Sequence, residues 1–199
     1  MTRRKLLSDH VVIAAIILAG LTLVLALTGD AMRESLQWTR SGVQHGEWWR
    51  LVTAHVVHLD LFHALLNTAV LILLAALFGH VFTPVRHGFN AIVGILFIDA
   101  GLLWLGNLEW YVGLSGLLHT LAAASVVRLI IDFHDRVAWG IAIFGLGKIV
   151  YENTMGAMLF SEREVSVVTD VHLFGVLIGM ALGLIPARPR PSAQLNDLV

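Results

Sequence analysis

A hydroxyl and an imidazole that could together perform acyl transfer stand in two separate apolar segments of the chain. Ser115 lies in the run Gly113-Leu114-Ser115-Gly116, and His172 opens the last apolar segment. A serine hydroxyl is a weak nucleophile unless a base takes its proton, and neutral imidazole is the side chain best suited to that task near pH 7. The pair therefore predicts a hydrolase with Ser115 as nucleophile and His172 as general base.

Polar residues in the second apolar segment supply candidate donors for the negative charge of a tetrahedral intermediate. His63 and Asn67 are four residues apart, so a helix places them on one face, with His58 about 140° round from His63. Polar side chains in a membrane helix are costly unless they face protein or water. Each one alone is explained by hydrogen bonding between helices, but beside Ser115 and His172 they predict an oxyanion site. His63, Asn67 and the Ser115 amide would be its donors.

Glycine spacing predicts how the last apolar segment packs. Three glycines recur four residues apart: Gly175, Gly179 and Gly183. Such spacing lets two membrane helices approach closely. His172 precedes the first of these glycines by three residues, so docking against the fourth apolar segment would turn its imidazole toward Ser115. Gly113 and Gly116 would allow the backbone beside Ser115 to bend and pack closely.

The composition indicates that all of this chemistry takes place in a membrane. Hydrophobic residues make up 57% of the 199 residues and charged residues 14%, a balance typical of membrane proteins. Since a spanning helix needs ~20 mostly apolar residues, the chain can form about six spans and no large soluble domain. A net charge of -1 gives no basic signal for nucleic acid, and zero cysteines exclude disulfides, thiolate metal sites and a cysteine nucleophile. No cofactor is expected.

Polar breaks divide the chain into six expected spans. Their approximate bounds are residues 11–28, 51–82, 89–105, 115–131, 137–160 and 168–185. The fold class predicted is therefore an all-α membrane protein, with a six-helix membrane domain over 11–186. Residues 1–10 and 187–199 would be N-terminal and C-terminal tails on the cytoplasmic side.

The distribution of basic residues predicts the orientation. If the N-terminus is inside, eight basic residues fall in inner segments: Arg3, Arg4, Lys5, Arg86, Arg128, Arg136, Arg188 and Arg190. Four fall in outer segments: Arg33, Arg40, Arg50 and Arg163. An excess of Lys and Arg inside places both termini in the cytoplasm. Ser115 and His172 would then lie at the same depth, near the outer surface.

The separated motifs resemble the rhomboid family of intramembrane serine proteases. The resemblance rests on the run 46–53 (Gly-Glu-Trp-Trp-Arg-Leu-Val-Thr), the His58, His63 and Asn67 set, the run around Ser115, and His172 with its glycines. It implies a six-helix core with a water-filled cavity open to the outer side, and a Ser115–His172 dyad without an acidic third member. It also implies oxyanion binding by His63 and Asn67, a structured loop containing Trp49-Arg50, and cleavage of membrane-anchored proteins.

Within that family the chain is most similar to the rhombosortase branch. Many rhomboids carry a tyrosine that stacks on the catalytic imidazole, whereas this chain has His119, and the pattern Gly-Leu-Ser-Gly-x-Leu-His belongs to that branch. The branch implies exported substrates bearing a C-terminal glycine-rich motif, an apolar helix and a basic end, and a location in the bacterial inner membrane. His119 and His58 would support the active site. Val171 stands where a smaller residue is common.

Two other functions remain open on the sequence. Ten histidines invite a metal-dependent membrane enzyme or transporter, with His58, His63, His119 and His172 as ligands, although no His-Glu-x-x-His run accompanies them. An inactive rhomboid-like protein that binds membrane clients is the other alternative. The presence of Ser115, His172, His63 and Asn67 argues against this alternative, because a client-binding protein needs none of the four in particular.

Three charged residues have simpler readings. Asp99 and Lys148 lie at similar expected depths in the third and fifth spans, so a buried ion pair between them is a hypothesis. Asp170 is two residues from His172, and side chains at that spacing diverge on a helix. It is not expected to be a third catalytic member.

Overall fold

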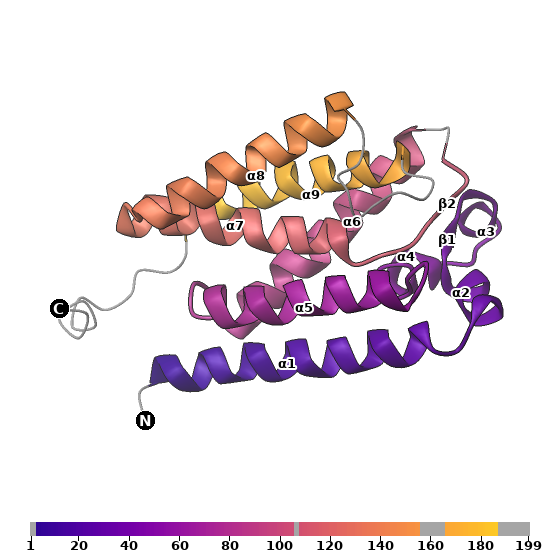
Figure 1. The fold of residues 1–199 in the computed structure, drawn as a ribbon, viewed down its shortest axis with the longest axis horizontal. Coiled ribbons are helices and arrows are strands. Elements are labelled where there is room, and N and C mark those ends of the chain that lie inside the picture. Colours follow the sequence, from indigo (N-terminus) through magenta and orange to yellow (C-terminus); the bar gives the residue numbers. More distant parts are fainter. Residues whose placement is uncertain (1–2, 106–107, 156–165, 187–199) are drawn as a thin grey trace.

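The computed structural model describes residues 3–105, 108–155 and 166–186, and this part of the chain is mostly helical. The long helices run alternately in opposite directions, so that α1 begins and α9 ends at the left of Figure 1. The long helices are α1 (Arg3–Ala26), α5 (Leu61–Phe78), α6 (Pro84–Leu105), α7 (Ser115–Phe133), α8 (Arg136–Met155) and α9 (Ser166–Leu184). The expected C-terminal tail, 187–199, lies outside the described residues.

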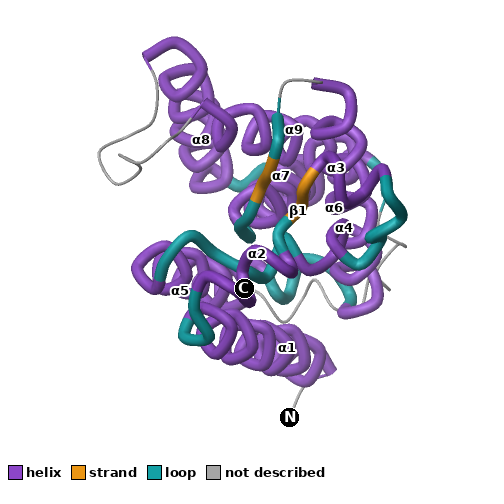
Figure 2. The backbone as a smooth tube through the Cα atoms, turned by 90° about the vertical axis from the view of Figure 1, so that its right-hand side faces the viewer, coloured by secondary structure: helices purple, strands orange, loops and turns teal. Residues whose placement is uncertain are grey.

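Short elements fill the connection between α1 and α5 at the other end of the bundle. These are α2 (Asp30–Leu36), β1 (Trp38–Thr39), α3 (Arg40–Gln44) and α4 (Arg50–Thr53). β1 lies antiparallel beside β2 (Trp110–Tyr111), with Trp38 opposite Tyr111, and Figure 2 shows the two strands side by side. The pairing joins this connection to the segment that leads into α7.

Two arginines hold the connection in place. The Arg40 guanidinium donates to the carbonyl oxygens of Leu102 (2.7 Å), Leu103 (3.1 Å) and Leu108 (3.1 Å), at and just beyond the end of α6. Arg50 donates to the carbonyls of Glu34 (2.8 Å) and Gln37 (2.6 Å) and forms an ion pair with Glu47. The connection is therefore ordered by charge-assisted hydrogen bonds to backbone carbonyls, which are stronger than neutral ones.

The second apolar segment differs from its prediction as a continuous span over 51–82. It forms α4 and α5, with non-helical residues 54–60 between them. The break arises because Asp60 caps α5: its carboxylate accepts a hydrogen bond from the His63 amide at 2.7 Å. His58 consequently lies in the loop before α5 and does not share a helix with His63.

Four helical segments are each long and apolar enough to cross a membrane: Asp9–Ala26, Leu61–Phe78, Pro84–Trp104 and Ser115–Phe133. Within the described residues, Thr169–Leu184 is a shorter apolar helix, and α8, which carries Arg136, Lys148 and Glu152, does not qualify. Large apolar side chains cover the outer faces of the bundle, among them Ile17, Leu73, Ile92 and Phe144. Such an exterior suits contact with lipid rather than water.

The closest helix packing joins α7 to α9, where glycines take the place of side chains. A Cβ on Gly175 would collide with the Gly116 carbonyl, and one on Gly179 would collide with the Thr120 carbonyl. At Gly183 it would lie 2.7 Å from the Ala124 oxygen. Three successive turns of α9 thus rest directly on the backbone of α7.

The end of α9 is held by two arginines from neighbouring helices. Arg86 of α6 donates to the Leu182 carbonyl at 3.1 Å, and Arg128 of α7 donates to the Gly183 carbonyl at 3.4 Å. The last carbonyls of a helix have no partner within it. The arginines supply those partners and place positive charge at the negative end of the helix dipole.

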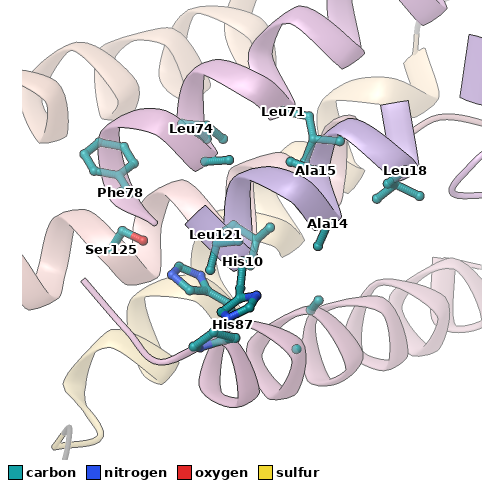
Figure 3. A pocket seen from close by; sticks show the side chains of 15 residues that line it. His10, Ala14, Ala15, Leu18, Leu71, Leu74, Phe78, His87, Leu121 and Ser125 are labelled. Atoms are coloured by element: carbon teal, nitrogen blue, oxygen red, sulfur yellow. The ribbon is translucent and has the colours of Figure 1, made fainter. Parts of the chain in front are cut away.

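An apolar cavity of about 230 Å³ lies among α1, α5, α6 and α7. Its polar lining comes from His10, His87 and Ser125, seen in Figure 3 among leucine and alanine side chains. His10 lies early in α1 and Phe78 ends α5, so the cavity is at the end of the bundle opposite to Ser115.

Candidate active site

Ser115 is the first residue of α7, and the backbone before it is sharply bent. Gly113 has a φ of 125°, a conformation that favours glycine. The Gly113 amide donates to the Ala54 carbonyl at 2.9 Å, and the Tyr111 hydroxyl donates to the Gly113 carbonyl at 2.5 Å. Leu114, at the N-cap, offers no side-chain hydrogen bond to the first turn. The N-cap side chain therefore gives the opening amides of α7 no hydrogen bond, and these amides lie at the positive end of the helix dipole.

The hydrogen bond from the Tyr111 hydroxyl to the Gly113 carbonyl does not depend on pH near neutrality. Burial raises the pKa of the Tyr111 hydroxyl, and the Asp99 carboxylate acts in the same direction, while hydrogen bonding with the Gly116 backbone and then with the Ser115 side chain acts in the opposite one. The phenol consequently stays protonated and keeps donating to Gly113. The start of α7 is fixed by a hydrogen bond that does not titrate near neutral pH.

His172 lies in the first half of α9 and is buried. Its Nδ1 lies 3.0 Å from Oε2 of Glu152, a residue of α8. Because a carboxylate only accepts, Nδ1 carries the proton and Nε2 carries the lone pair. Nε2 is buried and makes no hydrogen bond within the described part of the chain. The imidazole is thus oriented with its basic nitrogen unoccupied.

Ser115 and His172 are brought together through His119. The His119 Nδ1 donates to the Ser115 carbonyl at 2.7 Å, and its ring stacks on that of His172 with centroids 4.2 Å apart and planes at 24°. The hydrogen bond from Ser115 Oγ to His172 Nε2 is not formed, since Nε2 has no partner. In structures without substrate, catalytic hydrogen bonds are often long or poorly aligned.

His63 and His58 border the bend before Ser115. A Cβ on Gly113 would lie 3.2 Å from Cε1 of His63, so this imidazole covers the glycine. Nε2 of His58 accepts from the Leu114 amide at 3.4 Å, and the His58 and His63 rings meet edge to face at 4.9 Å. Burial lowers the pKa of His58 to about 3, with His63 acting in the same direction, so His58 remains a neutral acceptor.

Asn67 is buried one turn after His63. Its Nδ2 donates to the His63 carbonyl at 3.0 Å within α5. An amide nitrogen has two hydrogens, so one remains for a ligand. Three segments, α5, the 108–114 approach and α9, therefore converge on the start of α7.

A carboxylate next to the imidazole is the main feature that the sequence analysis did not anticipate. The resemblance implied a dyad without an acidic member, whereas Glu152 contacts His172. Glu152 also accepts from Lys148 at 2.7 Å, so the hypothetical Asp99–Lys148 pair does not form. Asp99 instead lies 3.5 Å from His55. A Lys and a Glu four residues apart in the mostly apolar sequence of α8 were the available signal, because two such charges need partners in a membrane.

The histidines do not converge as a metal-binding cluster would. Over residues 3–105, 108–155 and 166–186, no group of three or more His, Cys, Asp or Glu side chains is arranged to hold a metal ion. His58 and His63 lie against Gly113 and Leu114, while His119 and His172 stack on each other.

The chain matches one family among known proteins. Residues 45–189, more than half of the chain, match the sequence model of the family described as Rhomboid domain. No curated protein matches the chain.

Proposed function

The chain belongs to the rhomboid family and is an integral membrane protein, and from this premise we propose that it is an intramembrane serine endopeptidase. Ser115 would be the nucleophile and His172 the general base. The observation that carries the proposal is the His172 ring, which donates from Nδ1 to Glu152 and stacks on His119, whose own Nδ1 donates to the Ser115 carbonyl.

The proposed reaction has two balanced steps. Ser115 Oγ bonds to the peptide carbonyl carbon while its proton moves to His172 Nε2, and that proton then leaves with the amine as the C–N bond breaks. Water repeats the sequence on the acyl-enzyme, giving the carboxylate product and returning the proton to Ser115. The opening amides of α7, with His63 and Asn67, would stabilise the oxyanion in both steps.

Six spans, with both termini in the cytoplasm, are the topology we propose for the 11–186 domain. Four described segments are long and apolar enough to cross alone. α8 and α9 would cross in contact with α7, because Lys148, Glu152 and His172 satisfy one another inside the bundle. The active site would then face the outer side of a bacterial inner membrane.

For the substrate, we propose membrane-anchored proteins with a C-terminal glycine-rich motif ahead of an apolar helix and a basic end, as in the rhombosortase branch. Hydrolysis requires an extended backbone, and glycine weakens a helix by ~1 kcal/mol relative to alanine. A diglycine would let such a tail unwind at the start of α7. The Gly-Leu-Ser-Gly-x-Leu-His run supports this branch.

The deciding experiment is cleavage of a tethered reporter in liposomes. The reporter carries a diglycine, an apolar helix and a basic tail, and the native protein is compared with Ser115→Ala and with added chelator. We expect cleavage that Ser115→Ala abolishes and chelator leaves unchanged. Loss of activity with chelator would support the metal-dependent alternative.

A client-binding protein without activity is the second candidate. It is favoured by the absent hydrogen bond between Ser115 and His172. Stable binding of the reporter, with no cleavage of it or of a generic rhomboid substrate, would support that function instead.

A further inference from the structure

We propose that Glu152 is a positioning residue that makes the Ser115–His172 pair a triad, and that Lys148 sets its carboxylate. This inference rests on the proposed protease function and adds an acidic member to it. Glu152 is a residue of α8, whereas the nucleophile and base come from α7 and α9. Three helices would then contribute one member each.

The two oxygens of Glu152 have separate partners. Oε2 accepts from His172 Nδ1 at 3.0 Å, and Oε1 accepts from Lys148 Nζ at 2.7 Å. An ion pair that served only α8 would need the lysine alone, as residues four apart on a helix pair without outside help. Oε2 instead points out of α8 toward His172, the proposed general base.

The same network fixes the tautomers of both stacked imidazoles. Lys148 Nζ also lies 3.3 Å from His119 Nε2, and an ammonium group only donates, so this nitrogen accepts. His119 Nδ1 then donates to the Ser115 carbonyl, and His172 Nδ1 donates to Glu152. Lys148 therefore holds the carboxylate and the stacked ring at once, leaving His172 Nε2 as the unoccupied basic nitrogen.

Burial strengthens the effect of the Glu152 charge on His172 when the imidazole takes up the Ser115 proton. The Glu152 side chain is 4% exposed and that of His172 is 8% exposed. When His172 takes the Ser115 proton it becomes an imidazolium, and Glu152 stabilises this cation in surroundings that screen charge less than water does. Before that step Lys148 balances Glu152, so the buried carboxylate is never an unpaired charge.

The test compares Glu152→Gln, Glu152→Asp and Asp30→Asn with the native protein in liposomes. Asp30→Asn removes an ion pair with Arg33, three residues away on α2, and this pair belongs to none of the helices that carry Ser115, Glu152 and His172. Active sites are counted by covalent labelling with a fluorophosphonate, and kcat is expressed per labelled site. We expect Glu152→Gln to lower kcat about 10²- to 10⁴-fold with little change in KM, since the amide no longer selects the productive tautomer. Glu152→Asp should recover part of this loss, and Asp30→Asn should match the native protein.

The outcomes separate the two proposals. No labelling of the native protein, or labelling that survives Ser115→Ala, overturns the protease function itself. Labelling of the native protein at a rate that Glu152→Gln leaves unchanged overturns only the triad. If Glu152→Gln reduces the number of labelled sites but not the rate per site, Glu152 is structural and the inference is wrong.

If Glu152→Gln does not fold, Lys148→Met provides a second test, because it leaves Glu152 in place. We expect its kcat per labelled site to fall about tenfold or more through loss of the Glu152 and His119 contacts. Native kcat in this variant would contradict the role given to Lys148, and with it the network that orients Glu152.

Discussion

His119 contacts both Ser115, the proposed nucleophile, and His172, the proposed base. Its ring stacks on His172, and its two nitrogens bond to the Ser115 carbonyl and to Lys148. A tyrosine there keeps a stacking ring but loses both nitrogen contacts. Because each hydrogen bond contributes about 1 kcal/mol and a factor of ten in rate is about 1.4 kcal/mol, we expect the loss of both in His119→Tyr to lower kcat about 30-fold.

His119→Ala, which also removes the ring, should lower kcat further in the same liposome assay. Aromatic pairs contribute about 0.5 to 1.5 kcal/mol beyond area burial. Equal activity of the tyrosine and alanine variants would show that the stack has no role in holding His172.

His58 provides a pH-dependent stability at this site. Burial lowers its pKa to about 3, whereas the unfolded value is about 6.5. Between these values the unfolded chain binds more protons than the native chain, so stability falls as pH decreases through this range. At about pH 5 the loss from this one group is about 2 kcal/mol.

His58→Gln retains an oxygen acceptor for the Leu114 amide and cannot titrate. We expect the drop in detergent melting temperature from about pH 7.5 to about pH 5 to be smaller in His58→Gln than in the native protein. Equal drops in the two proteins would mean that His58 is not held neutral by the fold.

At the scale of elements, the α7–α9 contact depends on missing side chains. We expect Gly175→Ala to lower the melting temperature in detergent, since its Cβ would meet the Gly116 carbonyl and overpacking costs about 1 to 3 kcal/mol. Cleavage activity should fall as well, because His172 would shift relative to Ser115.

Gly145→Ala is the matched control. It also lies in a long helix, and its Cβ would meet nothing within 4 Å. We expect an unchanged or higher melting temperature, because alanine favours helix over glycine. Similar destabilisation by both substitutions would exclude close packing as the reason for the Gly175 effect.

Apolar segments and the polar breaks between them predicted most of the long helices, and the differences between prediction and structure come from local side-chain chemistry. α7 begins at Ser115, two residues after the bend at Gly113, and the α9 glycines do lie on α7. The break at 54–60 was not predicted, because hydropathy outweighed the capping signal of Asp60. Glu152 was not predicted because its partner His172, and the His119 ring that contacts Lys148, are brought to α8 only by tertiary packing.

For the whole molecule, topology is the prediction that decides where the chemistry occurs. The chain has no cysteine, so single cysteines can be introduced without a background. Glu109 is exposed near the active site, and Thr83 is exposed at the α5–α6 turn. In intact cells we expect a membrane-impermeant maleimide to label Glu109→Cys, but to label Thr83→Cys only after permeabilisation.

The reverse labelling pattern would place the Ser115 end in the cytoplasm. It would contradict both the orientation predicted from basic residues and cleavage at the outer face. Labelling of both positions in intact cells would contradict opposite locations for the two ends of the bundle.

The two arginines at the end of α9 have a mechanical consequence for the imidazole near its start. A helix restrained at one end can pivot or rotate about its axis, and sliding by one turn would displace a side chain by about 5.4 Å. Arg86 and Arg128 anchor the last turn of α9, while Glu152 anchors His172. With hydrogen bonds at both ends, α9 resists sliding and rotation. The orientation of His172 therefore depends on the Arg86 and Arg128 guanidinium groups, more than two helical turns away.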